Sequence, residues 1–241
     1  MIAAVTFDFW ETLVHDTPEN LERGRVLRLQ GLGALLARIG APQSWAVLDD
    51  AYERSGALLR ERHWAHQRDV CIADQVRIFL DCVESGLAAR LAAEALGEAV
   101  EIYAAPVLRL PPLLSHGADA AVRGLAARGL RLGVVSNTGR TPGVVLRRVL
   151  ERHGLLRYFT TLSYSDELGV RKPAPAIFDR TLAALGVTSD RATHVGDNPV
   201  DDVQGARRCG IRAVHYAANG ARPAPDADLI VEELHELLAL V

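Results

Sequence analysis

The sequence lacks the features that mark several common classes of protein. Its 27 lysines and arginines stand against 30 acidic residues, a formal net charge of -3, so we expect no nucleic acid and no membrane surface as partner. Only three cysteines occur, none in a CxxC pair, which argues against a zinc site or a disulfide framework. The first residues carry no basic leader and no apolar stretch reaches transmembrane length, which predicts a cytoplasmic protein.

Short apolar runs that end in polar residues recur along the chain. Residues 2–7, 130–135, 159–163, 192–195 and 213–216 have the composition of buried parallel strands, and helical patterns separate the later runs. This alternation predicts an α/β fold with a Rossmann-like, doubly wound parallel sheet. Ligands bind such sheets at the carboxyl ends of the strands.

The region 17–106 breaks the alternation. Leucine, alanine, arginine and glutamate recur there at helical spacing without a convincing strand, which predicts an inserted all-helical domain of about four helices. The prolines between Pro106 and Pro112 predict a return linker without a helix. We therefore expect a core of residues 1–16 and 107–241 and a helical domain of residues 17–106.

Polar clusters follow four of the predicted strands. Asp8 ends the first, where a carboxylate can act as a covalent nucleophile. Ser136 and Asn137 follow the second and offer a hydroxyl and an amide to an oxyanion such as a phosphoryl group. A third cluster contains Lys172, a point cation suited to phosphate. The fourth, residues 196–202, offers several carboxylate oxygens of the kind that Mg²⁺ prefers.

The order Asp-x-x-x-Thr, Ser-Asn-Thr, Lys-Pro and Gly-Asp-x-x-x-x-Asp resembles the four motifs of the haloacid dehalogenase (HAD) superfamily. The insertion resembles the helical (C1-type) cap that closes over the site in one subfamily. The resemblance implies a hydrolase that forms an aspartyl-phosphate on Asp8, with Thr12 ordering the first loop. It also implies Mg²⁺ as cofactor. The implied metal ligands are Asp8, the main-chain carbonyl of Trp10, Asp197 and Asp202.

The resemblance further assigns phosphate binding to Ser136 and Asn137 and charge balance to Lys172. Arg140, which follows Ser-Asn-Thr-Gly, is a further candidate phosphate contact. Of the adjacent acids Asp201 and Asp202, only Asp202 fits the motif spacing. A second interpretation of Asp202 is that it caps the next helix.

The sequence departs from the family pattern at Trp10. Family phosphatases carry an aspartate there that protonates the leaving alcohol and activates the hydrolytic water. An indole does neither, so general acid–base assistance of about 10²–10⁴-fold is at risk. Glu11 and His15 are nearby candidates to replace that aspartate. Residues on the solvated side of the first loop are the second interpretation of both.

We therefore expect a Mg²⁺-dependent phosphatase or phosphotransferase for a small phosphorylated metabolite, with slow turnover. A metal-independent, dehalogenase-like hydrolase is one alternative, although the acidic Gly196-Asp197 loop speaks against it. A catalytically weak phosphate-binding or regulatory protein is another, suggested by Trp10. The phosphonatase branch requires a cap lysine, and residues 18–106 contain none.

Two further features lie outside the four motifs. The basic and aromatic run 60–68 is either a solvated helix end or a contact for an anionic leaving group. His194 is expected as a packed core histidine. Substrate specificity is expected to depend on side-chain directions in the cap.

Overall fold

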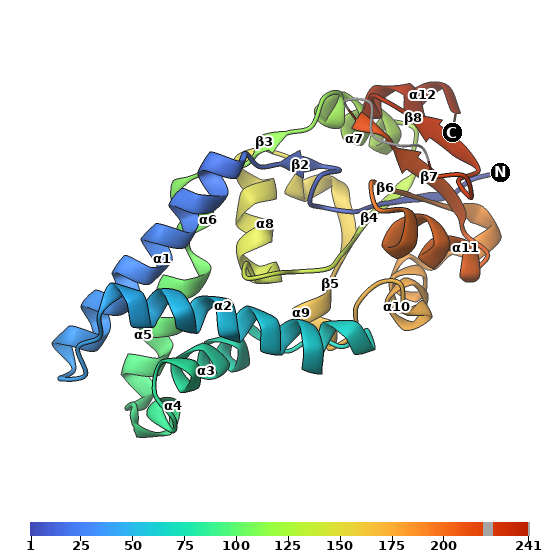
Figure 1. Cartoon of the computed structure of the whole chain (residues 1–241). Helices are drawn as coiled ribbons and strands as arrows, with labels where there is room; N and C mark the ends of the chain where they lie inside the picture. Colours follow the sequence, from blue (N-terminus) through green and yellow to red (C-terminus); the bar gives the residue numbers. More distant parts are fainter. Residues whose placement is uncertain (219–223, 241) are drawn as a thin grey trace.

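The computed structural model describes residues 1–218 and 224–240. Its core is a six-stranded parallel sheet with strand order β5-β4-β1-β6-β7-β8 (Figure 1). The chain winds outward from β1 in one direction and then in the other, so β1 lies at the switch point where such sheets bind ligands. The strands are β1 (Ala4–Phe7), β4 (Arg131–Ser136), β5 (Phe159–Tyr164), β6 (Ala192–Gly196), β7 (Arg212–Tyr216) and β8 (Leu229–Val231).

Helices follow the strands and cover the sheet, which confirms the predicted α/β class (Figure 1). Central strands are buried on both faces, as Val5, Phe7, Val134 and Val195 are fully inaccessible. The helices are α7 (Ala118–Ala127), α8 (Gly143–Arg152), α9 (Ser165–Leu168), α10 (Pro175–Leu185), α11 (Gly205–Arg208) and α12 (Leu237–Leu240). Shorter helical turns are η2 (Leu156–Tyr158), η3 (Ser189–Arg191), the π-helical η4 (Pro199–Gln204) and η6 (Leu234–Glu236).

The five predicted strands all form, and their ends differ from the expected ones by two residues at most. The sequence did not indicate β8, nor the antiparallel pair β2 (Val14–His15) and β3 (Leu113–Leu114). Runs of two or three residues carry too little periodicity to be recognised. The β2–β3 pair lies where the chain leaves the core and where it returns, so it holds the two connections side by side.

The insertion between these connections is all helical and is called the cap below (Figure 1). Helix α1 begins where the Thr17 hydroxyl accepts a hydrogen bond from the Asn20 amide at 3.1 Å. The cap has its own buried cluster, which includes Leu32, Phe79 and Tyr103. Its helices are α1 (Pro18–Arg38), α2 (Trp45–Arg62), η1 (Trp64–His66), α3 (Ile72–Val83), α4 (Leu87–Arg90) and α5 (Ala93–Ala104).

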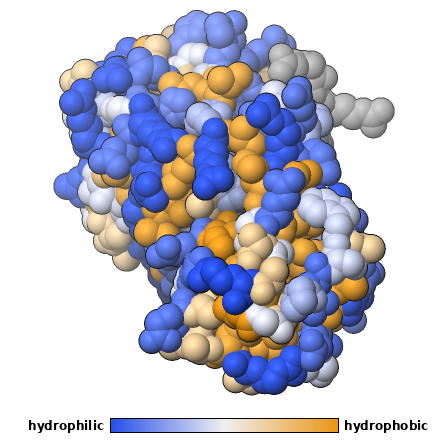
Figure 2. All heavy atoms as spheres, turned by 90° about the vertical axis from the view of Figure 1, so that its left-hand side faces the viewer, coloured by the Kyte–Doolittle hydropathy of each residue, from blue (hydrophilic) through white to orange (hydrophobic). Residues whose placement is uncertain are grey.

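The return connection differs from the expected linker because Pro106 starts a short helix, α6 (Pro106–Arg109). Proline fits the first position of a helix, where its missing N–H would have no partner. Helix α6 contacts both α1 of the cap and α8 of the core. Figure 2 views the molecule from the cap side and shows apolar patches interrupted by hydrophilic side chains. In the described part of the chain, no helix is both long and apolar enough to cross a membrane.

Candidate active site

Asp8 is the first residue after β1 and lies at the centre of a buried ionic cluster. Its backbone amide donates to the Val195 carbonyl at 2.8 Å, which fixes the start of the loop. The side chain is only 9% exposed, and its Oδ1 accepts from Lys172 Nζ at 2.5 Å. Burial raises the pKa of Asp8 to about 7; Lys172 opposes the rise, and Asp202 and Asp197 add to it. Cations beside it therefore decide whether Asp8 is an anion.

Lys172 joins two carboxylates at this point. Its Nζ lies 2.5 Å from Asp8 Oδ1 and 2.5 Å from Asp202 Oδ1. Burial alone would lower the pKa of Lys172, but the charges of Asp202 and Asp8 raise it above its ordinary value. The amine therefore stays an ammonium ion. Lys172 is the only lysine of the chain, and every other residue in the count of lysines and arginines is an arginine.

A histidine behind Asp202 holds that carboxylate in place. His194 Nε2 lies 3.0 Å from Asp202 Oδ1, and His194 Nδ1 lies 2.9 Å from the Thr6 hydroxyl. Burial lowers the pKa of His194, so the ring is neutral. Since a carboxylate only accepts, Nε2 donates and Nδ1 accepts from Thr6. His194 therefore positions Asp202 in addition to packing in the core. Its place on β6, two residues before Gly196 and so on the same face of the strand, could have indicated this role.

Three carboxylates approach one another at the strand ends. Oxygen atoms of Asp8, Asp197 and Asp202 all lie within 4.8 Å of each other. Asp202 uses both its oxygens on protein donors, because Oδ2 accepts from the Asn198 amide at 3.0 Å. Burial raises the pKa of Asp197 to about 6, and Asp202 adds to the rise. Asp8 and Asp197 therefore have the oxygens that are freer to bind a cation.

The loop around these acids depends on small local interactions. The Thr12 hydroxyl, fully buried, lies 3.4 Å from Asp197 Oδ1 and connects the first loop to the fourth. A side chain at Gly196 would overlap the Asp202 carboxylate, so the backbone there can approach only as glycine. Asn198, and not Asp202, caps the following turn, since its side chain accepts from the amides of Val200 and Asp201.

Ser136 and Asn137 end β4 but differ in their surroundings. Ser136 is fully buried, and its hydroxyl has no hydrogen-bond partner among residues 1–218 and 224–240. Asn137 Oδ1 accepts from the Lys172 amide at 2.8 Å, while its Nδ2 donates to the Lys172 carbonyl and to Asp201, both at 3.1 Å. The Asn137 side chain therefore positions the Lys172 segment, and the Ser136 hydroxyl is left for a ligand oxygen.

A second polar network fastens the cap to the core. Asp69, which follows η1, accepts from Ser165 Oγ at 2.5 Å and from Arg171 Nη1 at 2.6 Å. The Arg171 guanidinium also lies over the Trp64 ring, 4.6 Å from its centroid. Backbone bonds between residues 67–69 and 169–171 add to the contact. The basic run at the end of α2 thus continues into a docking segment.

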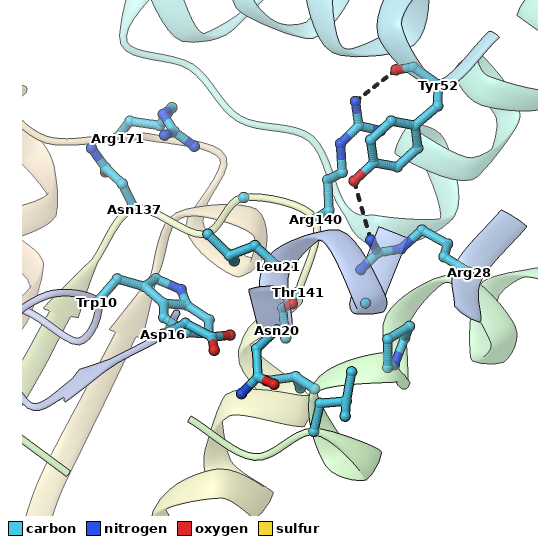
Figure 3. Close-up of a pocket in the computed structure, with 15 residues that line it drawn as sticks. Trp10, Asp16, Asn20, Leu21, Arg28, Tyr52, Asn137, Arg140, Thr141 and Arg171 are labelled. Carbon is cyan, nitrogen blue, oxygen red and sulfur yellow. Dashed lines mark hydrogen bonds between the residues drawn. The ribbon is translucent and has the colours of Figure 1, made fainter. Parts of the chain in front are cut away.

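Between core and cap lies a cavity of about 390 Å³, called the cap cavity below (Figure 3). Trp10 and Asn137 form its wall on the core side. Arg28 and Tyr52 line it on the cap side. Asp8 and Lys172 are not part of this wall, but Asn137, which is, hydrogen-bonds the backbone of Lys172 and so links the cavity to the ionic cluster. A small ligand fits there with one end at the strand ends.

A model of the haloacid dehalogenase-like hydrolase family matches residues 2–210. The chain belongs to this family. Its solved structural relatives include a 2-haloacid dehalogenase from Pseudomonas syringae pv. tomato, with a TM-score of 0.75, 26% identity and coverage of 100% of this chain and 98% of that one. A HAD phosphatase from Thermococcus onnurineus has a TM-score of 0.64 and 27% identity, covering 99% and 97%.

Two curated relatives of this chain are phosphatases by name. Phosphoserine phosphatase of Thermus thermophilus is 37% identical over 166 residues, which are 67% of this chain and 62% of that protein. Phosphoglycolate phosphatase of Rhodospirillum rubrum is 42% identical over 98 residues, 41% of this chain and 39% of that protein. The chain thus spans less than two thirds of the length of either relative.

The two candidates to replace the acid missing at Trp10 lie away from the cap cavity. Glu11 adopts a left-handed backbone, with φ of 56°. Its side chain and that of His15 line a different cavity, beside Ser115 and Glu233. Asp16, which the sequence analysis did not single out, lines both cavities. It is the one carboxylate in the described wall of the cap cavity.

Arg140 extends away from the strand ends. Expected as a phosphate contact, it instead donates to the Tyr52 carbonyl at 2.7 Å and to the hydroxyl of Tyr103. Both residues belong to the cap. The turn at Gly139 directs the following side chain toward α2, and sequence adjacency to the Ser-Asn-Thr motif does not reveal that direction.

Proposed function

We propose that this hydrolase is a Mg²⁺-dependent phosphatase that forms an aspartyl-phosphate on Asp8 and acts on a small phosphorylated metabolite. The observation that carries the proposal is the buried Asp8–Lys172 pair, at 2.5 Å, beside the unpartnered Ser136 hydroxyl. An anionic nucleophile, a cation and a free donor together suit the attack on a phosphoryl group. The names of the two curated phosphatases support the same class of reaction.

The acids of the site fit a hard divalent cation. Three carboxylates with oxygens within 4.8 Å of one another face one ammonium ion, which leaves excess negative charge. Asp8, Asp197 and the Trp10 carbonyl would hold Mg²⁺, and Asp202 would support the site through Lys172. When bound, Mg²⁺ neutralises charge on the transferring phosphoryl group.

In the first half-reaction, an Asp8 oxygen attacks phosphorus and the bond between phosphorus and the leaving oxygen breaks. The Ser136 hydroxyl and the Lys172 ammonium bind the phosphoryl oxygens. In the second, water attacks the same phosphorus, the bond to Asp8 breaks, and inorganic phosphate leaves. Trp10 supplies no proton to the first step and removes none in the second, so we expect good leaving groups to be preferred and hydrolysis of the intermediate to be slow.

Asp16 is an additional candidate for the missing acid. Its carboxylate lines the same cavity as Trp10, and it accepts from the Thr17 amide at 2.9 Å, which leaves other lone pairs free. Glu11 and His15 face the other cavity. We therefore expect Asp16→Asn to lower turnover of alkyl phosphates, and Glu11→Gln and His15→Ala to leave it unchanged.

A dehalogenase-like reaction is the second candidate. Overall similarity to the Pseudomonas 2-haloacid dehalogenase favours it, and a halide leaves without a proton, which suits Trp10. The cluster of Asp8, Asp197 and Asp202 argues against it, because attack on carbon does not require those acids to bind a cation.

Turnover of phosphorylated metabolites and of an aryl phosphate, measured with and without Mg²⁺, tests the proposal. We expect Mg²⁺-dependent release of phosphate and a phosphorylated Asp8 by mass spectrometry, both absent in Asp8→Asn. Halide release from 2-chloropropionate without Mg²⁺ would replace phosphatase by dehalogenase. If no substrate turns over and Asp8 stays unmodified, the regulatory alternative stands instead.

A further inference from the structure

Two guanidinium groups, those of Arg28 and Arg140, converge on Tyr52 at the cap side of the cap cavity (Figure 3). Arg28 of α1 donates from Nε to the Tyr103 carbonyl at 2.6 Å and from Nη1 to the Tyr52 hydroxyl at 3.2 Å. Arg140 of the core reaches the same place, with its guanidinium carbon 3.6 Å from the Tyr52 ring centroid. The Arg28 guanidinium carbon lies 5.9 Å from that centroid and that of Arg25 lies 5.4 Å from it, so three positive charges share one aromatic ring.

Neither charge has an acidic partner in the part of the chain that the structure describes. Arg28 is 6% exposed, and among the described residues no carboxylate lies within 4.0 Å of Arg28 or Arg140. By contrast, Arg25 on the same helix pairs with Asp49, and Arg171 pairs with Asp69. The partners of Arg28 and Arg140 are carbonyls and hydroxyls, which do not cancel charge. A buried cation without a counter-ion costs free energy that an anion would recover.

The surrounding residues make room for this arrangement. A side chain at Gly56 of α2 would overlap Arg140 Nη2, so the glycine admits the guanidinium to its position. Both arginines line the cap cavity together with Asn137, which lies beside the phosphoryl site. Leu21 and Val107 add apolar surface to the same wall. The cavity therefore joins a core side next to the phosphoryl site, apolar surface and two guanidinium groups on the cap side.

We propose that Arg28 and Arg140 form an anion subsite for the leaving group, so that the preferred substrates are small phosphate monoesters bearing a second anionic group, a carboxylate or a phosphate. This inference rests on the proposed phosphatase function. Guanidinium groups bind both anions through charge-assisted hydrogen bonds. The volume of about 390 Å³ limits the leaving group to a few carbon atoms or one ring.

Arg140 also has a structural role, because it joins the core to the cap through Tyr52. A residue that only latched the cap would affect every substrate alike. An anion subsite changes the ratio of rates between a charged leaving group and an uncharged one of the same size. The ratio therefore separates the two roles.

Three aryl phosphates of nearly equal size test the subsite, since an aryl leaving group needs little protonation. They carry carboxymethyl, phosphonomethyl or uncharged carbamoylmethyl in the para position. We expect kcat/KM for at least one anionic substrate to exceed that of the amide by about tenfold or more, the value of a charge-assisted hydrogen bond. The carboxylate and phosphonate arms show which anion is preferred.

Variants locate the preference. Arg28→Lys and Arg140→Lys should each reduce the ratio of acid to amide about tenfold, because a lysine at either place loses the two-pronged geometry. Gly56→Ala should do the same by displacing Arg140 without removing charge. Arg54→Lys is the matched control, since Arg54 on α2 pairs with Asp50 and lies outside the cavity wall. Circular dichroism verifies that each variant is folded.

Equal kcat/KM for acids and amide, or an unchanged ratio in all the folded variants, would overturn the subsite while leaving the phosphatase proposal intact. Failure of all three substrates, with no phosphorylated Asp8, would overturn both. A reduction of the acid rates alone, with Arg54→Lys unchanged, is the result that the subsite requires.

Discussion

The ionic cluster at the strand ends, called the core end below, and the arginines on the cap side of the cap cavity, called the cap end, differ in how their charges are balanced. At the core end, Lys172 is bound by two carboxylates, and Asp202 is further held by His194 and by the Asn198 amide. At the cap end, Arg28 and Arg140 lie against carbonyls and tyrosines without an acid within reach in the described chain. The charges at the core end are already balanced within the protein. Those at the cap end would be balanced only by an anionic group of the substrate.

This difference separates two tasks. Catalysis needs groups held rigidly where charge develops, and the core provides them at the ends of packed strands. Discrimination between substrates needs protein groups that find a partner only in the correct ligand. The two arginines of the cap end meet this need because they lack negatively charged partners. Trp10 lines the core side of the cap cavity with an apolar ring. Its side chain offers no group that could act as a general acid.

The largest expected effect is that of Asp8→Asn at the core end. Without the nucleophile, turnover should fall on the order of 10⁴-fold or more, and no phosphorylated intermediate should be detected by mass spectrometry. Binding of an anionic product at the cap end should persist, because the arginines are untouched. Residual Mg²⁺-dependent turnover near the native rate would show that the reaction does not pass through Asp8.

Lys172→Met tests how much of the core end depends on its single lysine. It leaves two buried carboxylates without their cation, so we expect a loss of about 3–5 kcal/mol in the free energy of unfolding and a fall of about 10²–10³-fold in kcat. Urea denaturation measures the first. Arg147→Met is the control, since its pair with Glu167 is about a third exposed and should contribute about 1 kcal/mol or less. An equal loss of unfolding free energy in both variants would contradict the proposed dependence of the core end on Lys172.

The sequence predicts the residues of the core end better than those of the cap end. Asp8, Ser136 and Asp197 could be brought together in advance because the carboxyl ends of parallel strands share one edge of a sheet, whereas Lys172, which lies beyond α9, was indicated only by the order of the motifs. Arg28 and Tyr52 could not, because they lie on helices whose rotation about their axes is set by packing. Those side-chain directions become visible only in the folded cap.

Two misdirected candidates show the same limit within the core. Glu11 lies beside Trp10 in sequence, yet its left-handed backbone, with φ of 56°, sends it toward the other cavity. Arg140 adjoins the phosphate motif, yet the chain beyond Gly139 turns toward the cap. Adjacency in sequence gives distance along the backbone and not the direction of a side chain.

Trp10→Asp tests the wall between the two ends. An aspartate there should protonate a leaving alcohol, and we expect turnover of alkyl phosphates to rise by about 10–10²-fold, within the usual range of general acid catalysis. Aryl phosphates should gain less, because their leaving groups need little protonation. Comparison of the two classes in native and variant protein measures this. A uniform rise or fall for both would indicate an effect on binding and not on proton transfer.

The smallest effect concerns the pH dependence of cation binding at the core end. Burial raises the pKa of Asp8 to about 7 and that of Asp197 to about 6, so protons compete with Mg²⁺ for the same oxygens as pH falls through that range. We expect the affinity for Mg²⁺, measured by titration calorimetry, to fall by up to about tenfold per pH unit between pH 7 and pH 6. Because Asp8→Asn removes one of the two titrating ligands, its affinity should be lower and should fall less steeply. An affinity that stays constant across this range in the native protein would mean that the cation does not use these two carboxylates, and that the charge contrast between the two ends is not linked to a metal.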